Sequence, residues 1–361
     1  MPTKTAEETR CASAVSLLET AKLDALLVTN LHNVRYLTGF TGSNGAVLLL
    51  KDKPAVLFTD PRYTVQSQQQ VTCRVKIAKG PLNAAILQEI GRARLRRVGF
   101  EQDNLTVGQM SGLTKRKPAK VHMEPVTGLI ENLRLVKDAG EIEKIRTSVL
   151  TNSNALDAAL KQFKVGMKES ELAAEIDYQN RKLGAEAPAF DTIVAAGERA
   201  ALPHAQPGGT AIGPGILLID MGAFQAGYAS DMTRMVHVGT PTPKYKKAYR
   251  AVLEAQLAAI AAVKPGAKTN AVDRAARSTL KQHGLERQFI HSTGHGLGLE
   301  IHELPRLGRK DKTRLAEGMA ITIEPGVYIE GWGGIRIEDT VLVTAKGCEI
   351  LTPTSKMLRV I

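Results

Sequence analysis

The sequence predicts two domains, a smaller α/β domain over residues 1–133 and a larger α+β domain over residues 134–361. With 361 residues the chain is longer than most single domains, and its composition, 43% hydrophobic and 23% charged, is that of a globular protein with sizeable cores. Over the first third, short β-rich runs alternate with helix-period segments. Beyond about residue 135 the helices come in pairs and the strands follow in groups, which favours antiparallel strands.

The N-terminal domain is predicted from its alternation of strands and helices. The runs with strand composition are Leu26–Thr29, Ala46–Leu50, Ala55–Thr59 and Arg97–Phe100. Helical periodicity covers about 6–23, 81–96 and 106–116. Because helix-period segments separate some of the strand-like runs, this order predicts a mixed sheet that is covered by helices.

A capping box marks the start of the second domain. Asp138 followed by Glu141 has the spacing in which two side chains satisfy the first free backbone N–H groups of a helix. Apolar residues then recur along one helix face at Ile142, Ile145, Val149, Leu156 and Leu160. We therefore expect the domain boundary within about 128–137. Further helices are expected at about 168–184, 243–263 and 269–283, with strands and Gly-rich turns from there to the end.

Composition excludes several classes of protein. No run approaches the roughly 18 apolar residues of a membrane-spanning helix, and the N-terminal MPTKTAEETR is polar and contains acids, unlike a secretory signal. We therefore expect a cytoplasmic protein with no membrane partner. The three cysteines, Cys11, Cys73 and Cys348, are far apart and form no C-x-x-C pair, so neither a disulfide framework nor a thiolate zinc site is expected.

The net charge of +12 raises the question of a nucleic-acid partner. Residues 1–135 hold 19 Lys and Arg against 11 Asp and Glu, so most of the excess is N-terminal. It concentrates in Arg92–Arg97 and Lys115–Lys120, and neither run is interleaved with aromatic residues. A solvated helix face is the favoured interpretation of each run, and no nucleic-acid partner is expected.

Two aspartates give the first indication of a site. The strand-like runs Ile216–Asp220 and Tyr228–Thr233 are joined by a short connection. A hairpin that turns midway between Asp220 and Asp231 would place them directly opposite each other. Like charges in this position destabilise a sheet unless a cation lies between them, so the pair indicates a divalent metal or a shared proton. The alternative, one aspartate in the turn facing solvent, stays open.

Histidines cluster in a glycine-rich segment. His291, His295 and His302 lie within twelve residues that also contain glycine at every second position from 294 to 298. These glycines disfavour a helix, so the H-x-x-x-H spacing is not that of the helical zinc peptidases. The imidazoles are expected to act from an extended or looped segment, where glycines bring the backbone close to whatever the rings bind.

Two further carboxylates lie in or after apolar strands. Glu324 directly follows the apolar run Met319–Ile323 and precedes Pro-Gly, which would end the strand. Farther along, Arg336 and Glu338 are two residues apart and so share one face of a predicted strand from Gly333 to Asp339, with isoleucines on the other face. If the isoleucines pack on the core, the polar face looks into a cavity. The alternative, an exposed ion pair on an edge strand, stays open.

Together these segments supply four carboxylates and an imidazole, enough for two divalent ions that share carboxylates and water. Such oxygen-rich ligands suit manganese, cobalt or zinc better than a metal that prefers thiolates. Paired metals lower the pKa of a water and stabilise a tetrahedral intermediate, so hydrolysis is the expected chemistry. The residues by themselves predict a dinuclear metal hydrolase.

These motifs resemble those of the Xaa-Pro peptidases, the aminopeptidase P and prolidase group of the pita-bread metallopeptidases. The resemblance spans nearly the whole chain, since Asn30–Phe40 and Thr59–Tyr63 are similar to that group's N-terminal domain. It implies a creatinase-like α/β domain followed by an α+β pita-bread (methionine aminopeptidase-like) domain. It also implies five metal ligands, which fall on Asp220, Asp231, His295, Glu324 and Glu338.

The resemblance also implies roles around the metals. His204 matches the family's histidine on the substrate side, and His291 and His302 match the two that flank the metal-binding histidine. Arg336 matches an arginine that orients substrate and acidic ligands. In the family's mechanism a metal-activated water attacks the carbonyl before proline, Glu324 carries the proton, and His291 and His302 support the substrate and the developing oxyanion. Two divalent ions per chain, manganese first with cobalt or zinc as alternatives, and a homodimer or higher oligomer are implied as well.

The resemblance leaves the substrate length open. An aminopeptidase P-type enzyme, which removes an N-terminal residue preceding proline, is the leading expectation because Phe40–Gly45 resembles small bacterial chains of that type. A prolidase, which cleaves Xaa-Pro dipeptides, is the alternative, and it would need a donor for the free carboxylate of its substrate. A non-catalytic binding protein of the same fold is a remote alternative, because such proteins tend to lose ligands that are complete here.

Overall fold

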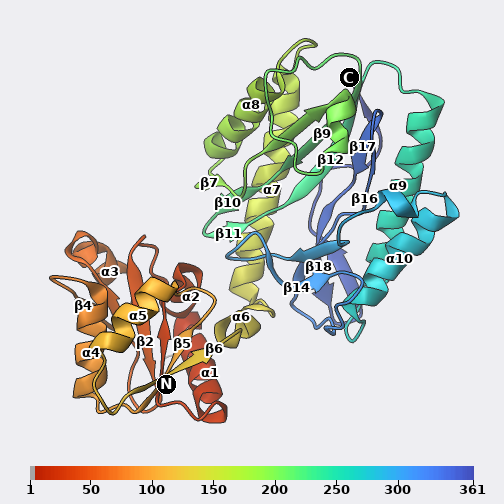
Figure 1. The fold of residues 1–361 in the computed structure, drawn as a ribbon. Coiled ribbons are helices and arrows are strands. Elements are labelled where there is room, and N and C mark those ends of the chain that lie inside the picture. The colour runs from red at the N-terminus through yellow and green to blue at the C-terminus, as the bar shows by residue number, and fades with distance from the viewer. Residues whose placement is uncertain (1–4) are drawn as a thin grey trace. The chain divides into compact units, whose positions relative to one another are not determined.

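The computed structural model describes residues 5–361, and the chain divides into two compact units between Arg134 and Leu135 (Figure 1). The first unit is an α/β domain and the second an α+β domain, as the sequence predicts. Within the part of the chain that is described, every helix is too short or too polar to cross a membrane.

A six-stranded mixed sheet forms the core of the N-terminal unit, in the order β4-β3-β2-β1-β5-β6. Its strands are β1 (Ala25–Val28), β2 (Gly45–Leu50), β3 (Val56–Thr59), β4 (Arg74–Ile77), β5 (Arg97–Glu101) and β6 (His122–Val126). β1 pairs antiparallel with β2 and parallel with β5, so the strand direction changes within the sheet. Every residue of β1 and β2 is buried, as expected for the central strands of a sheet covered on its faces.

Helices surround this sheet. They are α1 (Ala6–Thr20), α2 (Leu31–Thr38), α3 (Thr64–Gln70), α4 (Leu82–Arg92), α5 (Val107–Arg116) and α6 (Leu129–Arg134), with a 3-10 turn η1 (Pro61–Tyr63). Capping boxes of Thr5 with Glu8 and of Thr106 with Gln109 fix the starts of α1 and α5. The sequence did not predict α2, α3, α6, β4 and β6. The three helices have at most eight residues, too few for helical periodicity. β4 and β6 are the edge strands of the sheet, and because their residues are exposed or half-buried they lack the apolar runs of the inner strands.

The C-terminal unit has two pairs of helices around its strands. The helices are α7 (Ala139–Gln162), α8 (Glu169–Lys182), α9 (Pro243–Ala261) and α10 (Thr269–Gln282), with 3-10 turns η2 (Gly197–Ala201) and η3 (Glu286–Gln288). The predicted capping box of Asp138 and Glu141 starts α7. α7 and α8 lie on one side of the strands and α9 and α10 on the other (Figure 1), and an apolar cluster lies under each pair.

The strands of this unit form four sheets among the residues described. A four-stranded sheet has the order β20-β12-β9-β8, from β8 (Ile193–Ala196), β9 (Gly215–Met221), β12 (Met232–Val238) and β20 (Arg359–Val360). A five-stranded sheet has the order β14-β13-β15-β18-β19, from β13 (Gly294–Gly296), β14 (Glu303–Leu307), β15 (Ala320–Ile323), β18 (Asp339–Thr344) and β19 (Gly347–Ile350). β16 (Gly326–Ile329) pairs with β17 (Gly333–Arg336), and β10 (Ala223–Gln225) pairs with β11 (Tyr228–Ala229) and β7 (Ala187–Pro188).

The hairpin that carries the two aspartates has a different register from the predicted one. Ala226 and Gly227 form its tip with positive φ angles of 50° and 78°, as in the type I′ turns that suit the twist of paired strands. Asp220 consequently pairs with Thr233, and the prediction that it lies directly opposite Asp231 is wrong. The two aspartates are offset because the turn lies one residue farther along the chain than assumed.

The segment expected to be one strand from Gly333 to Asp339 is two strands. β17 ends at Arg336 and β18 begins at Asp339, and they belong to different sheets. Glu338 lies in the irregular connection, where its backbone N–H donates to the carbonyl oxygen of Thr233 at 3.3 Å. Arg336 and Glu338 are both buried, so the alternative of an exposed edge-strand ion pair is wrong.

Candidate metal centre

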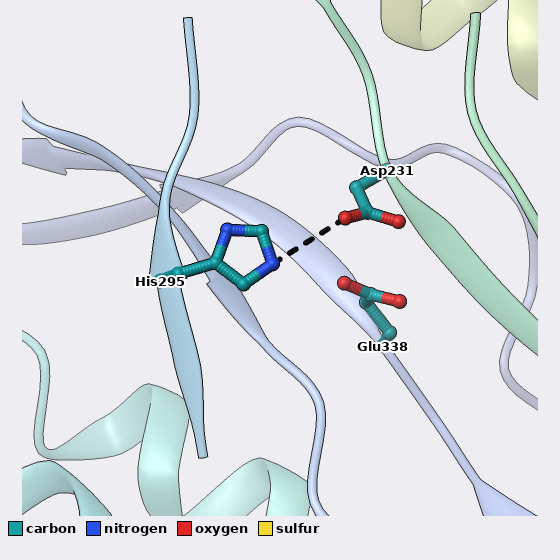
Figure 2. Close-up of side chains that lie close together, drawn as sticks. All are labelled: Asp231, His295 and Glu338. Carbon is teal, nitrogen blue, oxygen red and sulfur yellow. Dashed lines mark ion pairs between the residues drawn. The ribbon is translucent and has the colours of Figure 1, made fainter. Parts of the chain in front are cut away.

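Three side chains of ligand type converge in the C-terminal unit: Asp231, His295 and Glu338. Asp231 directly precedes β12, His295 is the central residue of β13, and Glu338 connects β17 to β18. One ligand atom from each lies within 4.8 Å of the other two, and the three side chains point toward one another (Figure 2). Nε2 of His295 is 3.5 Å from Oδ2 of Asp231. This spacing can accommodate a divalent cation between the three groups.

The backbone around His295 fixes which imidazole nitrogen faces the carboxylates. Nδ1 is 3.0 Å from the carbonyl oxygen of Gly296, and since a carbonyl only accepts, Nδ1 carries the proton and Nε2 presents its lone pair. A Cβ atom on Gly294 would lie 1.9 Å from the carbonyl oxygen of Thr322, and one on Gly296 would lie 2.1 Å from that of Leu304. The glycines therefore let β13 approach its neighbours more closely than any other residue would.

Glu324 and Asp220 lie beside this group but are held by other protein side chains. Oε1 of Glu324 is 3.4 Å from Nε2 of His295 and accepts a 3.3 Å hydrogen bond from the Thr322 hydroxyl. Oδ2 of Asp220 accepts a 2.6 Å hydrogen bond from the Arg336 guanidinium. The five side chains expected from the sequence thus lie in one region, three as a compact group and two beside it.

Burial gives these groups unusual acid strengths. Burial first, and then the charges of Glu338, Asp220 and Glu324, raise the pKa of Asp231 well above its usual range. Burial and the charges of Glu324 and Asp220 likewise raise the pKa of Glu338. Burial lowers the pKa of His295, so its ring is neutral near pH 7. Several carboxyl groups are therefore packed together with too little positive charge to stabilise their ionised forms.

Two carboxylate oxygens in this region have no hydrogen-bond donor among residues 5–361. These are Oδ1 of Asp220 and Oε1 of Glu338, and both are buried. Buried polar atoms are nearly always paired, and an unpaired one costs about 1–3 kcal/mol. Divalent cations would satisfy both oxygens, and a donor set of carboxylates with a neutral imidazole suits manganese, cobalt or zinc. The residues therefore fit the metal ions that the sequence motifs imply.

His302 and His204 lie on the accessible side of the same group. The rings of His302 and His295 are in edge-to-face contact, with centroids 4.4 Å apart. Burial, followed by the charges of His295 and His204, lowers the pKa of His302. His302 is therefore neutral near pH 7, and its ring can form a hydrogen bond with a bound ligand. His204 is exposed to solvent and close enough for its charge to act on His302.

A hydrogen-bond chain leads from His291 to Asp220 through Tyr328, a residue that the sequence motifs do not indicate. The hydroxyl of Tyr328 is 2.9 Å from Nε2 of His291 and accepts a 2.6 Å hydrogen bond from Nη1 of Arg336. Nη2 of the same guanidinium donates to Asp220. Nδ1 of His291 is 2.7 Å from the carbonyl oxygen of Ser292, so both ring nitrogens have protein partners. The only signal in the sequence for Tyr328 is a hydroxyl-bearing side chain within the apolar strand β16.

Both units match models of known protein families. Residues 10–136 match the Creatinase/Prolidase N-terminal domain. Residues 143–345 match Metallopeptidase family M24. The second match includes every residue named above as part of the candidate metal centre or its surroundings.

Similar proteins cover almost the whole chain. A Xaa-Pro dipeptidase of Pyrococcus furiosus is 36% identical over 351 residues, which are 97% of this chain and 99% of that protein. The structure of a Xaa-Pro dipeptidase from Bacillus anthracis superposes with a TM-score of 0.95 at 37% identity, over 98% of this chain and 100% of that one. The structure of an X-Pro aminopeptidase from Thermotoga maritima has a TM-score of 0.89 at 35% identity, over 94% and 98%.

Proposed function

The chain belongs to metallopeptidase family M24, and on this premise we propose that it is an Xaa-Pro dipeptidase, a prolidase. It is a metallo-exopeptidase of the Xaa-Pro peptidase group. The sequence motifs favoured aminopeptidase P-type cleavage, with prolidase as the alternative. The similar proteins support the alternative better, because the P. furiosus protein and the B. anthracis structure both carry the name Xaa-Pro dipeptidase.

The proposal depends on one observation: a side chain near the candidate metal centre can bind the free carboxylate of a dipeptide. Arg306 of β14 is the direct partner of His295 of β13, so the two side chains share one face of the sheet. Arg306 is exposed, and its charge acts on both His295 and His302. A guanidinium beside the metal centre and open to solvent can bind a carboxylate through two parallel hydrogen bonds.

The other side chains would orient the peptide and move its proton. When bound, two divalent ions would polarise the scissile carbonyl and lower the pKa of a water. Glu324, whose pKa is raised by burial, would accept the proton of the attacking water and pass it to the proline nitrogen. His302 would donate a hydrogen bond to the carbonyl oxygen as negative charge develops there. Arg336 would keep Asp220 in place, and His204 would line the substrate side.

Substrate length tests the proposal. We expect kcat/KM for an Xaa-Pro dipeptide to exceed that for its C-terminal amide and for the extended Xaa-Pro-Yaa tripeptide by about tenfold or more, since hydrogen bonds to charged groups contribute about 1.5–3 kcal/mol. The Arg306→Met variant should lose this preference through a KM for the dipeptide that rises about 10- to 100-fold. Arg309→Met, at an exposed position three residues farther along, is the matched control and should keep it.

An Xaa-Pro aminopeptidase is the second candidate, and the T. maritima structure favours it. It requires that the tripeptide be cleaved at least as fast as the dipeptide and that Arg306→Met leave the tripeptide rate unchanged. Those two results together would replace the dipeptidase proposal.

We also propose manganese as the preferred ion, with cobalt or zinc as alternatives, and a homodimer as the assembly. Metal-dependent kinetics and light scattering, respectively, test these two points.

A further inference from the structure

The segment that carries His291 depends on a helix for its position. Residues 289–292 lie between η3 and β13, where neither a helix nor a sheet pairs their carbonyl groups. Buried carbonyl oxygens require donors. One side chain of α10 supplies them: Nη1 of Arg277 donates to the carbonyl oxygen of Phe289 at 2.8 Å, and Nη2 donates to that of His291.

Asp273, one helical turn before Arg277, holds the guanidinium in this position. The two side chains form a bidentate pair with N–O distances of 2.8 and 3.1 Å, and both are buried. Their i, i+4 spacing brings them together on one face of α10. The guanidinium also lies 4.1 Å from the centre of the Phe289 ring, and that ring meets the His291 ring edge-on with 5.0 Å between centroids.

The same aspartate reaches a second part of the site. Oδ1 of Asp273 accepts a 2.9 Å hydrogen bond from the hydroxyl of Thr293. The carbonyl oxygen of Thr293 in turn accepts a 2.8 Å hydrogen bond from the backbone N–H of Glu324. One buried ion pair on α10 therefore connects to the backbone of His291 in one direction and to the backbone of Glu324 in the other.

We propose that Asp273 and Arg277 are positioning residues for the reaction, which together set the places of His291 and Glu324. The inference rests on the proposed function, which makes Glu324 the proton carrier, and on the role beside the substrate that the family resemblance implies for His291. A buried ion pair is a poor way to stabilise a fold, since apolar residues of the same volume stabilise it as well or better. A bidentate fork, by contrast, fixes a geometry that apolar packing does not specify.

Replacing Arg277 with Lys tests the inference, because lysine keeps the charge but its single nitrogen, with three N–H donors, cannot reproduce the four hydrogen bonds of the planar guanidinium. We expect kcat for an Xaa-Pro dipeptide to fall about 10- to 100-fold, as for other groups that orient a metal site, while KM changes by less than about threefold and the metal content stays the same. Arg146→Lys is the matched control, because Arg146 forms an exposed bidentate pair with Glu349 in the same unit, with both distances 2.6 Å. Its kcat should not change.

Thr293→Val is a second, milder variant that keeps the inference testable if Arg277→Lys folds poorly. It removes only the hydroxyl that donates to Asp273, and we expect kcat to fall about 3- to 10-fold. Rates are compared per folded, metal-loaded chain, so that a loss of folded protein does not count as a loss of turnover. An unchanged kcat in the folded variants would overturn the inference.

The ring nitrogens of His291 give a readout that does not depend on activity. In ¹⁵N-histidine NMR spectra, the His291 signals should shift in Arg277→Lys while those of His302 stay in place. If the wild-type protein fails to cleave Xaa-Pro peptides, the proposed function is wrong, and these spectra alone decide the positioning role. A shift of the His291 signals then supports it, and unchanged signals overturn it.

Discussion

Glu338 and Asp339 are consecutive and fully buried acids, yet they occupy two different regions of the C-terminal unit. Asp339 accepts hydrogen bonds from three side chains of the protein, those of Arg234, Gln256 and Lys356. Glu338 accepts one hydrogen bond, 2.7 Å long, from the hydroxyl of Thr233, and its other oxygen has no donor within the described chain. The chain supplies the partners of Asp339, so this acid serves the fold. Glu338 is left open among like charges, so it is suited to bind a cation.

We call the surroundings of Asp339 the paired region and those of Glu338 the open region. The paired region also holds the backbone of the open region in place. The guanidinium of Arg234 donates to the backbone carbonyl oxygens of Thr233 and Glu338 and to those of Thr354 and Ser355 near the C-terminus. The C-terminal segment and the connection that carries Glu338 are therefore fixed to the same strand, β12. The backbone of Glu338, a candidate metal ligand, is thus held by side chains that lie outside the candidate metal centre.

Replacing Glu338 with Gln affects the open region and has the largest expected effect. The amide is not an anionic ligand, so we expect at least one divalent ion per chain to be lost and kcat/KM to fall by a factor on the order of 1,000 or more, because a metal contributes several kcal/mol. Elemental analysis and kinetics measure both.

Chelation of the wild-type protein should also abolish activity, with manganese or cobalt restoring it. Metal-free protein that still hydrolyses peptides in the presence of chelator would contradict the assignment.

Asp339→Asn is the matched variant in the paired region, and its effect should be on stability. It leaves Arg234 and Lys356 without their shared counter-charge in a buried position, so we expect the free energy of unfolding to fall by about 3–5 kcal/mol. Below the unfolding transition, the folded protein should retain its metal ions. Denaturant titration and elemental analysis test the two points. Full stability with loss of metal would show that the two regions are not separate.

Replacing His302 with Ala tests whether the protein can lose turnover while it keeps its metal ions. Its ring contacts that of His295 but stands outside the three-residue group of ligand atoms. We expect kcat to fall by a factor on the order of 100 with the metal content unchanged, and the same for His291→Ala, as is typical of groups that transfer protons or stabilise charge. Kinetics paired with elemental analysis tests this. Metal loss in either variant would make the histidine a ligand.

The smallest expected effect is on the free energy of unfolding, from replacing a surface acid of the N-terminal unit. Oδ2 of Asp24 accepts hydrogen bonds from the backbone N–H groups of Arg96 and Arg97, at 2.8 and 2.9 Å, and the bond from Arg97 contributes most to lowering its pKa. A lowered pKa means that this stabilisation is present above the unfolded value, near 4, and is lost as the pH falls through the folded value. Asp24→Ala should lower the free energy of unfolding by about 0.5–1 kcal/mol at pH 7. Denaturant titrations at pH 7 and pH 3 should show this difference shrinking, and a constant difference would refute the assignment.

Much of the fold could be predicted because local signals agree with it. The capping box at Asp138 and the apolar periodicity after it predict α7, and the helix-period segments predict the other long helices. The hairpin register could not be predicted in the same way. It depends on positive φ angles at Ala226 and Gly227. Glycine is typical of such a turn, but alanine seldom adopts this conformation, so Ala226 gives no signal that the turn begins there.

In the candidate site, the residues predicted from the sequence are carboxylates, histidines and an arginine, whose side chains are of the types that bind metals or transfer protons. Asp273 and Arg277 have an ordinary helical spacing, and their importance arises from backbone carbonyls of a segment whose path no periodicity predicts. Arg306 likewise becomes a candidate only once β13 and β14 are paired in register. Contacts made through the backbone or through strand register leave no pattern in the residue types.

The close approach around Gly294 and Gly296 limits how this protein can evolve. A side chain at either position would clash with the backbone of a neighbouring strand, so the strands would have to move apart to accommodate it. Libraries that randomise this segment should therefore lose most of their members at the folding step. Leu304 and Arg306 of the adjacent strand β14 are exposed, so their side chains can change without moving the backbone. New substrate preferences are expected to accumulate along β14, while β13 keeps its sequence.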